Sequence, residues 1–233
     1  MRLFAISDLH LSFGTDKPMD VFGPQWAGHA DKLRVAWDAR VGPSDWVLVG
    51  GDTSWGLTLA EARPDLDWLG ERPGRKVLIK GNHCTWWTSL SKVKANLHPS
   101  VHPLQHDAMR LDDGTIVIGA RLWDPPGSPW SDADTEKIYR REVERLKLAI
   151  ASADKLGEGR RIALVHYPPR YTDHRTTEFA PMLEAAGVRI CVYGHLHGKD
   201  HRSGFQGTFN GIRYHLASCD AVDFTPIEID LAS

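Results

Sequence analysis

The chain has 233 residues, enough for one sizeable domain with a buried core, and we expect a single domain over residues 1–233. An apolar share of 42%, a charged share of 25% and a formal net charge of −2 are ordinary for a globular protein and give no signal for nucleic acid or for a basic partner. Three cysteines without a C-x-x-C pair disfavour a disulfide scaffold. Without a secretory signal or an apolar run of bilayer length, we expect a cytoplasmic protein that does not associate with membranes.

Short apolar runs alternate with segments of helical spacing along most of the chain. In chain order we predict strands at 3–6, 46–49, 77–79, 116–118, 162–165 and 190–193, and helices at 28–40, 58–69, 88–95, 135–155 and 177–186. Continuous apolar runs are typical of strands that are covered on both faces. The alternation therefore predicts an α/β fold built from βαβ units.

The C-terminal part has a different pattern. Asn210-Gly211 lies between two short mixed runs at 208–214, which is a strong signal for a tight hairpin. A last strand is predicted at 227–231. Residues 123–130 read as a long irregular loop, of the kind that often carries specificity.

Polar residues follow the predicted strands in five blocks. The blocks are Asp8-Leu-His10, Gly51-Asp52, Gly81-Asn82-His83, His166 and Gly194-His195-Leu-His197. Ligands of open α/β sheets bind beyond the carboxyl ends of the strands, so these blocks are predicted to meet in space. Taken alone, each block is as easily explained by a surface turn or a structural histidine as by a metal site. The combination of all five, in this order, favours one shared site.

The donor types in these blocks indicate metal ions. Carboxylate, amide and imidazole groups without thiolate suit Mn²⁺, Fe and Zn²⁺, and suit Mg²⁺ less well. Seven ligands are too many for one tetrahedral site but fit two adjacent ions, with a bridging carboxylate and a bridging hydroxide as nucleophile. The glycines of the blocks permit sharp turns and close approach of the backbone.

On these motifs the sequence resembles the calcineurin-like metallophosphoesterase superfamily, whose pattern is D-x-H, G-D, G-N-H-(D/E), H and G-H-x-H. The resemblance spans residues 3–197 and is nearest to small bacterial phosphohydrolases whose G-N-H block runs into a Trp-Trp pair, here Trp86-Trp87. It implies a two-sheet α/β sandwich flanked by helices, with a dinuclear metal centre of manganese, iron or zinc.

The resemblance also implies roles for individual residues. Asp8, His10 and His197 would bind the first ion, Asn82, His166 and His195 the second, and Asp52 would bridge the two. His83 would be the catalytic residue that faces the substrate, where it would stabilise the developing charge or protonate the leaving oxygen. A general acid of this kind is commonly worth ~10²–10⁴-fold in rate.

One residue departs from the family pattern. Cys84 stands where Asp or Glu usually follows the G-N-H block and, in many members, hydrogen-bonds the histidine. Without that charged partner the pKa of His83 is expected to fall, which would reduce activity or shift the pH optimum. A harmless replacement by a small buried residue is the alternative. A changed pH–rate profile in Cys84→Asp would distinguish them.

Further residues near these segments are candidates for substrate contacts. Surface placement is as good a prediction as phosphate contact for Arg121, Tyr167, Arg170 and His201. Five tryptophans could form an aromatic wall that stacks a nucleobase, although packing is the better prediction for most of them. They are Trp55, Trp86, Trp87, Trp123 and Trp130.

The leading functional hypothesis is therefore a metal-dependent hydrolase of phosphate mono- or diesters, with a small-molecule substrate that includes nucleotides as candidates. A cyclic-nucleotide phosphodiesterase is a narrower alternative. A weakly active or non-catalytic binding scaffold on the same fold is a second alternative, which only Cys84 favours. A nuclease is disfavoured by the near-neutral charge.

Overall fold

Two β-sheets form the centre of the fold in the computed structural model, which describes residues 1–129, 131–173 and 175–231. The first sheet has the strand order β11-β1-β2-β3-β4, with β1 (Leu3–Ile6), β2 (Trp46–Val49), β3 (Arg75–Ile79), β4 (Val101–Leu104) and β11 (Ile227–Glu228). The second has the order β5-β6-β7-β8-β10-β9, with β5 (Asp107–Arg110), β6 (Ile116–Ala120), β7 (Arg161–Val165), β8 (Val188–Tyr193), β9 (Gly207–Phe209) and β10 (Ile212–Leu216).

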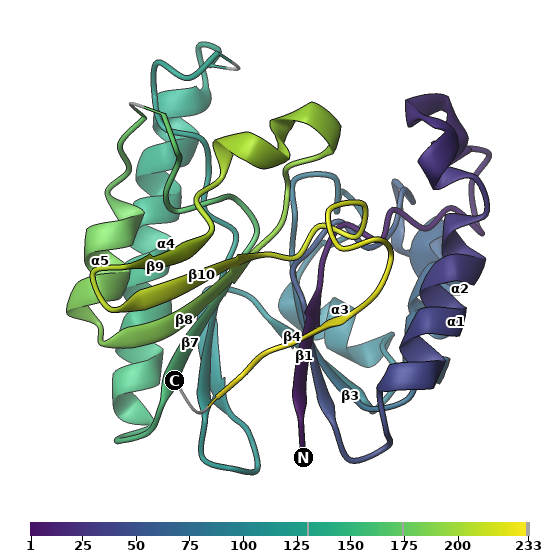
Figure 1. Ribbon diagram of the computed structural model, residues 1–233, viewed down its shortest axis with the longest axis horizontal. Helices are drawn as coiled ribbons and strands as arrows, with labels where there is room; N and C mark the ends of the chain where they lie inside the picture. The colour runs from purple at the N-terminus through teal and green to yellow at the C-terminus, as the bar shows by residue number, and fades with distance from the viewer. Residues whose placement is uncertain (130, 174, 232–233) are drawn as a thin grey trace.

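Helices cover the outer faces of both sheets. In Figure 1, α1 (His29–Arg40) and α2 (Leu59–Glu71) flank the first sheet, and α4 (Thr135–Lys155) and α5 (Phe179–Ala185) flank the second. The short helix α3 (Leu90–Ala95) packs against β4. The 3₁₀ helices η1 (Met19–Phe22), η2 (Pro24–Trp26) and η3 (Gly198–Ser203) lie in loops. The α/β sandwich flanked by helices is thus confirmed.

The apolar residues separate into three layers that match this architecture. One cluster joins α1, α2 and α3 to the first sheet, and includes Leu33 and Trp37, both fully buried. A second lies between the two sheets, around Val77 and Val192. The third joins α4 and α5 to the second sheet. Strands buried on both faces explain why the central runs are continuously apolar.

The central strands were predictable and two edge strands were not. All six predicted strands are present, and α1 to α5 cover the five predicted helices to within a few residues at each end. The sequence pattern did not predict β4, which contains Pro103, or β5, whose residues are half-buried or exposed. Both lie at sheet edges, where proline and polar residues are tolerated because one side of the strand has no ladder to maintain.

The C-terminal predictions hold in outline. Asn210 (φ 47°) and Gly211 (φ 80°) form the tight turn between β9 and β10, as the hairpin requires. The last strand is shorter than predicted and pairs antiparallel with β1. Residues 123–129 are the expected irregular loop, and Trp130 lies outside the described residues. Within the described part of the chain, no helix combines the length and hydropathy needed to cross a membrane.

Candidate metal centre

The five polar blocks lie at one edge of the two sheets. Within the first sheet β1, β2, β3 and β4 run parallel, so their carboxyl ends share an edge, the upper one in Figure 1. A parallel bridge between Ser7 and Ser218 joins the ends of β1 and β10, and thereby brings the second sheet to that edge. The loops after β1, β2, β3, β7 and β8 converge there.

Asp8, His10 and His197 form the first group of candidate ligands. One ligand atom from each lies within 4.8 Å of the others. The Nε2 atoms of the two histidines are 3.2 Å apart, and Nε2 of His197 is 3.7 Å from Oδ1 of Asp8. These are the three residues that the family resemblance assigns to one ion.

The second group is centred on Asn82. Its Oδ1 lies 2.7 Å from Nε2 of His166 and 3.0 Å from Nδ1 of His195. Asp52 reaches the same histidine, with Oδ2 at 3.3 Å from Nε2 of His166. Asp8, Asp52 and His166 also make a set within 4.8 Å, so Asp8 adjoins both groups. All seven predicted ligands are therefore gathered in one place.

The backbone is strained where it carries these side chains. Asp8, His10, Asp52 and His195 all have positive φ, between 45° and 72°, a region that is costly for residues other than glycine. Two glycines allow the loops to meet. A Cβ at Gly81 would lie 2.1 Å from Oδ1 of Asp52, and one on Gly194 would lie 2.2 Å from Oδ2 of Asp8.

Hydrogen bonds from backbone groups and from neighbouring side chains fix the orientation of several candidate ligands. Nδ1 of His197 lies 2.7 Å from Oδ1 of Asp220, and Nδ1 of His166 donates to the carbonyl of Gly50 at 2.9 Å. Both contacts turn Nε2 toward the candidate ligands. The hydroxyl of Ser218 and the backbone N–H of His195 donate to Oδ2 of Asp8, each at 2.9 Å. Such partners set ligand orientation and basicity at metal sites.

Sequence reasoning missed Asp220, although a usable signal was present. Asp220 follows β10 by four residues, in the same position relative to a strand end as the predicted ligands. The pattern at 208–214 predicts a hairpin but not its pairing with the other strands, and in the structure β10 runs parallel to β8.

The two buried carboxylates are ionised and give the centre a negative charge, which stabilises nearby cations. Burial opposes ionisation of Asp8 and Asp52, but His197 and His166 outweigh it and hold the pKa of both carboxyl groups well below the usual range. In turn Asp52 raises the pKa of His166, and Asp220 with Asp8 raises the pKa of His197 to about 10, each against the effect of burial.

The other two histidines stay neutral. Burial lowers the pKa of both His10 and His195 to about 3. A neutral imidazole keeps a lone pair on one ring nitrogen, and this is the form that binds metal ions.

Two buried ligand atoms without hydrogen-bond partners in the described part of the chain support metal binding by this set of donors. Oδ1 of Asp8 is fully buried and receives no hydrogen bond from the described residues, and Nδ1 of His10 is in the same state. Buried polar atoms are nearly always paired. Oxygen and nitrogen donors with an orphaned carboxylate oxygen among them suit Mn²⁺, Fe or Zn²⁺.

Comparison with known proteins decides the family. The family model for calcineurin-like phosphoesterases matches residues 1–199. The chain belongs to this family. It is therefore a phosphoesterase, a hydrolase of phosphate esters, and its ligand groups indicate that it depends on metal ions.

Individual proteins are similar to this chain in sequence or in fold. The phosphoesterase is 32% identical to the Gene 66 protein of Mycobacterium phage D29 over 203 residues, which are 84% of this chain and 79% of the phage protein. Its fold is similar to TT1561 of Thermus thermophilus, with a TM-score of 0.61, 11% identity and 98% of each chain covered. It is also similar to AQ665 of Aquifex aeolicus, a protein of unknown function, with a TM-score of 0.53, 15% identity and coverage of 97% and 95%. These two structures show the fold alone.

In the phosphoesterase, His83 lies beside the ligands and not among them. Its side chain is exposed, its ring centroid is 4.6 Å from Trp55 and 5.8 Å from His10, and its backbone N–H donates to Oδ1 of Asp52 at 2.8 Å. Loss of water around the ring lowers the pKa of His83.

Cys84 contacts the carboxylate that His83 also contacts. Its Sγ is buried, accepts a hydrogen bond from Gly81 N at 3.3 Å and donates to Oδ1 of Asp52 at 3.8 Å. Burial raises the pKa of the thiol to about 12, so it is uncharged at neutral pH. The carboxylate that the Cys84 side chain contacts is therefore that of Asp52, and the altered pH profile of Cys84→Asp stays a prediction.

The other candidates divide between the centre and the rest of the fold. The ring of Tyr167 lies 3.9 Å from that of His195, and His201 lies 3.1 Å from Oδ2 of Asp220. Arg170 lies 3.4 Å over the ring of Phe209. Arg121 is paired with Glu142 outside the ligand groups.

The tryptophans also divide. Trp86 and Trp87 belong to the core, whereas Trp55 stacks on His10 at 4.7 Å and Trp123 lies 4.8 Å from the ring of Tyr167. Trp26, which was not predicted, lies 5.6 Å from His197. Aromatic side chains therefore adjoin the centre, but as separate contacts on two sides.

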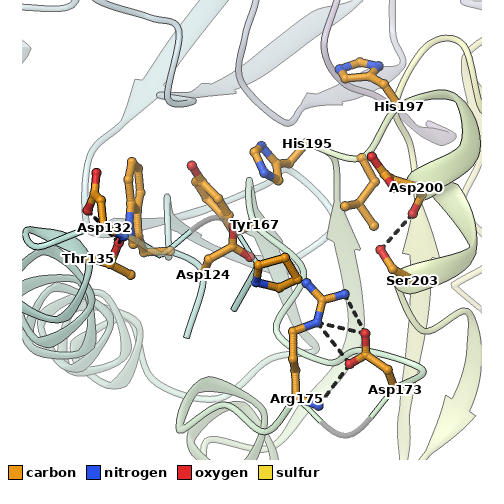
Figure 2. Close-up of a pocket in the computed structure, with 13 residues that line it drawn as sticks. Asp124, Asp132, Thr135, Tyr167, Asp173, Arg175, His195, His197, Asp200 and Ser203 are labelled. Atoms are coloured by element: carbon orange, nitrogen blue, oxygen red, sulfur yellow. Dashed lines mark hydrogen bonds and ion pairs between the residues drawn. The ribbon is translucent and has the colours of Figure 1, made fainter. Parts of the chain in front are cut away.

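Two cavities border the centre. One of about 560 Å³ extends from His195 and His197 to the polar residues Asp132, Asp173, Arg175 and Ser203, as Figure 2 shows. The other, of about 430 Å³, begins at His10 and His83 and is lined by Met19, Phe22, Trp26 and Trp55. His197 and Asp200 line both cavities.

Proposed function

We propose that the phosphoesterase hydrolyses phosphodiesters at a dinuclear metal centre held by the seven predicted ligands. In this proposal Asp8, His10 and His197 would hold one ion, Asn82, His166 and His195 would hold the other, and Asp52 would be shared between them. Support comes from the contacts within each group and from the buried negative charge at the centre. The metals proposed are Mn²⁺, Fe or Zn²⁺.

The proposal gives separate roles to the metal ions, to the groups that orient their ligands and to His83. When bound, two adjacent ions neutralise phosphate oxygens and lower the pKa of water. Asp220 and Gly50 keep His197 and His166 turned toward the centre, which removes the cost of orienting the rings in each turnover. His83, an exposed residue that lines the apolar cavity, would donate its ring N–H or a proton to the leaving oxygen.

The observation that favours a diester over a monoester is the pair of cavities. A phosphate held at the centre would have open space on the side of His195 and on the side of His10 and His83. A diester has two organic groups and can occupy both spaces, whereas a monoester leaves one empty. The lining predicts an asymmetric diester, with a polar group toward Asp173 and Ser203 and an apolar or aromatic group toward Phe22 and Trp55. A cyclic nucleotide is a narrower form of this substrate.

The proposal is tested with matched substrates. Bis(4-nitrophenyl) phosphate and 4-nitrophenyl phosphate are assayed with Mn²⁺, Fe²⁺, Zn²⁺ and Mg²⁺ in turn, together with a cyclic nucleotide. We expect metal-dependent hydrolysis with a higher kcat/KM for diesters. Preference for the monoester would contradict the choice of substrate, and full activity of Asp52→Asn would contradict the centre itself.

Variants in the apolar cavity separate substrate binding from catalysis. Phe22 lines the cavity and is 57% exposed, while its neighbour Val21 is 71% exposed and does not line it. Phe22→Ala is expected to raise KM for an aryl diester severalfold with little change in kcat, and Val21→Ala to leave both unchanged. His83→Gln should lower kcat by ~10²–10⁴-fold for esters with poor leaving groups. Equal effects of the two cavity variants would refute this assignment.

A further inference from the structure

A third cavity, of about 290 Å³, lies at the same edge of the sheets but apart from the centre. It is enclosed by the ends of β3, β4 and β6 and by α4. None of the seven candidate ligands lines it, and it shares no lining residue with the two cavities beside them. Its polar lining comes from Lys80, Thr88, Gln105, His106, Arg121, Arg141, Glu142 and Arg145.

Positive charge exceeds negative charge in this cavity. Glu142, which is 1% exposed, is the one acid among the described residues that line it. Its Oε1 lies 2.7 Å from both Nη2 of Arg121 and Nη1 of Arg145. Nε of Arg141 lies 3.8 Å from the same oxygen. One carboxylate therefore faces three guanidinium groups, which leaves two positive charges in excess before Lys80 is counted.

The cavity also contains a buried hydrogen-bond donor that has no acceptor among the described residues. Arg121 is only 15% exposed, and its Nε is buried without a hydrogen-bond partner among the described residues. A guanidinium carries five N–H donors and stays protonated in proteins. Although Glu142 pairs with one end of the Arg121 guanidinium, leaving its buried Nε–H without a hydrogen-bond partner is costly, so an anion that accepts from this group would be bound favourably. Guanidinium groups match the paired oxygens of phosphate.

We propose that this cavity is a second anion site, which binds a phosphate dianion independently of the metal centre. The volume admits the phosphate and a small organic substituent, so free phosphate and the phosphate of a small ester share the required chemistry.

The site is separate from the centre but connected to it. Lys80 directly precedes Gly81-Asn82 in the chain. The carbonyl of Arg121 accepts the backbone N–H groups of His166 at 3.2 Å and Tyr167 at 3.0 Å. Since phosphate is also expected to bind a metal-loaded centre, the test must exclude metal.

The test is calorimetry with inorganic phosphate, and with phenylphosphonate as an ester mimic, on the full chain treated with chelator. We expect one anion per chain. Arg141→Gln/Arg145→Gln should weaken binding by roughly tenfold or more, because each substitution removes a charged hydrogen-bond donor. The matched control is Lys147→Gln on the same helix, which pairs with Glu144 outside the cavity and should change affinity by less than about twofold. Tighter binding of phenylphosphonate would identify an ester as the ligand, and equal binding would identify free phosphate.

Three outcomes would overturn the site: no phosphate binding at millimolar concentration, unchanged binding in the double variant, or an equal loss in the control. If the double variant does not fold, amide chemical shifts of the wild-type chain decide. Phosphate should then shift residues around Arg121 and Arg145, and shifts confined to the loop of His195 and His197 would refute the proposal.

Discussion

Asp220 provides a sharp test of the proposed centre, because it contacts a ligand without being one. Its Oδ1 lies 2.7 Å from Nδ1 of His197, and Oδ2 accepts the Gly198 N–H at 3.0 Å. Asp220→Asn keeps the shape but removes the charge. Charged hydrogen bonds contribute roughly 1.5–3 kcal/mol and neutral ones about 0.5–1.5 kcal/mol, so the change should cost on the order of 1.5 kcal/mol.

That cost corresponds to roughly tenfold in metal affinity, at the lower end of the ~10–100-fold typical of residues that orient metal ligands. The assay is titration of the chelator-treated protein with Mn²⁺ or Zn²⁺ by calorimetry. Two binding steps are expected, and only the step that involves His197 should weaken. The contacts of Asn82 with His166 and His195 do not involve Asp220, so the other step should keep its affinity.

His201→Gln is the matched control. His201 lies 3.1 Å from Oδ2 of the same carboxylate but is not one of the seven candidate ligands, and Oδ1 is the oxygen that faces His197. Its loss should therefore have a smaller effect on metal affinity. Wild-type affinity in Asp220→Asn, or an equal loss in His201→Gln, would refute the reasoning.

Three other predictions concern folding and the buried groups. Burial lowers the pKa of Lys76 to about 8 from 10.5 in the unfolded chain, so the unfolded state binds more protons between these values and stability rises with pH. Between about pH 7.5 and 9.5 the free energy of urea unfolding should increase by about 2 kcal/mol more in wild type than in Lys76→Met, and equal slopes would contradict the shift. Gly194→Ala should impair folding or metal binding, since its Cβ would lie 2.0 Å from Ser7 Oγ, whereas Gly42→Ala, with its nearest contact at 3.4 Å, should be tolerated; equal melting temperatures and metal affinities would argue against the close approach. All three cysteines are buried, so a thiol reagent should label none in the native protein and three after unfolding, and rapid native labelling would refute their burial.

The residues of the centre were predictable because of where parallel strands end. Asp8, Asp52 and Asn82 each follow a continuously apolar run, and such runs form strands that share one edge. The same rule applied to β10 would have pointed to Asp220, but its strand was read as half of an isolated hairpin. The edge strand β4 is mostly buried, but His102 and Pro103 interrupt its apolar run, and the residues of β5 are half-buried or exposed, so neither strand has the continuous apolar pattern of the central strands.

The sequence by itself determined the fold class, the family motifs and the identity of the seven candidate ligands, because strand periodicity and residue order are local properties. Only the tertiary structure decided which ligands contact one another, that Asp220 orients His197 and that Cys84 contacts Asp52. It also decided that cationic residues just after β3 and β6 and on α4 line a separate cavity. The physical reason is that these contacts join residues distant in the chain. Side-chain distance, burial and charge balance arise when the two sheets pack together, and no single segment encodes them.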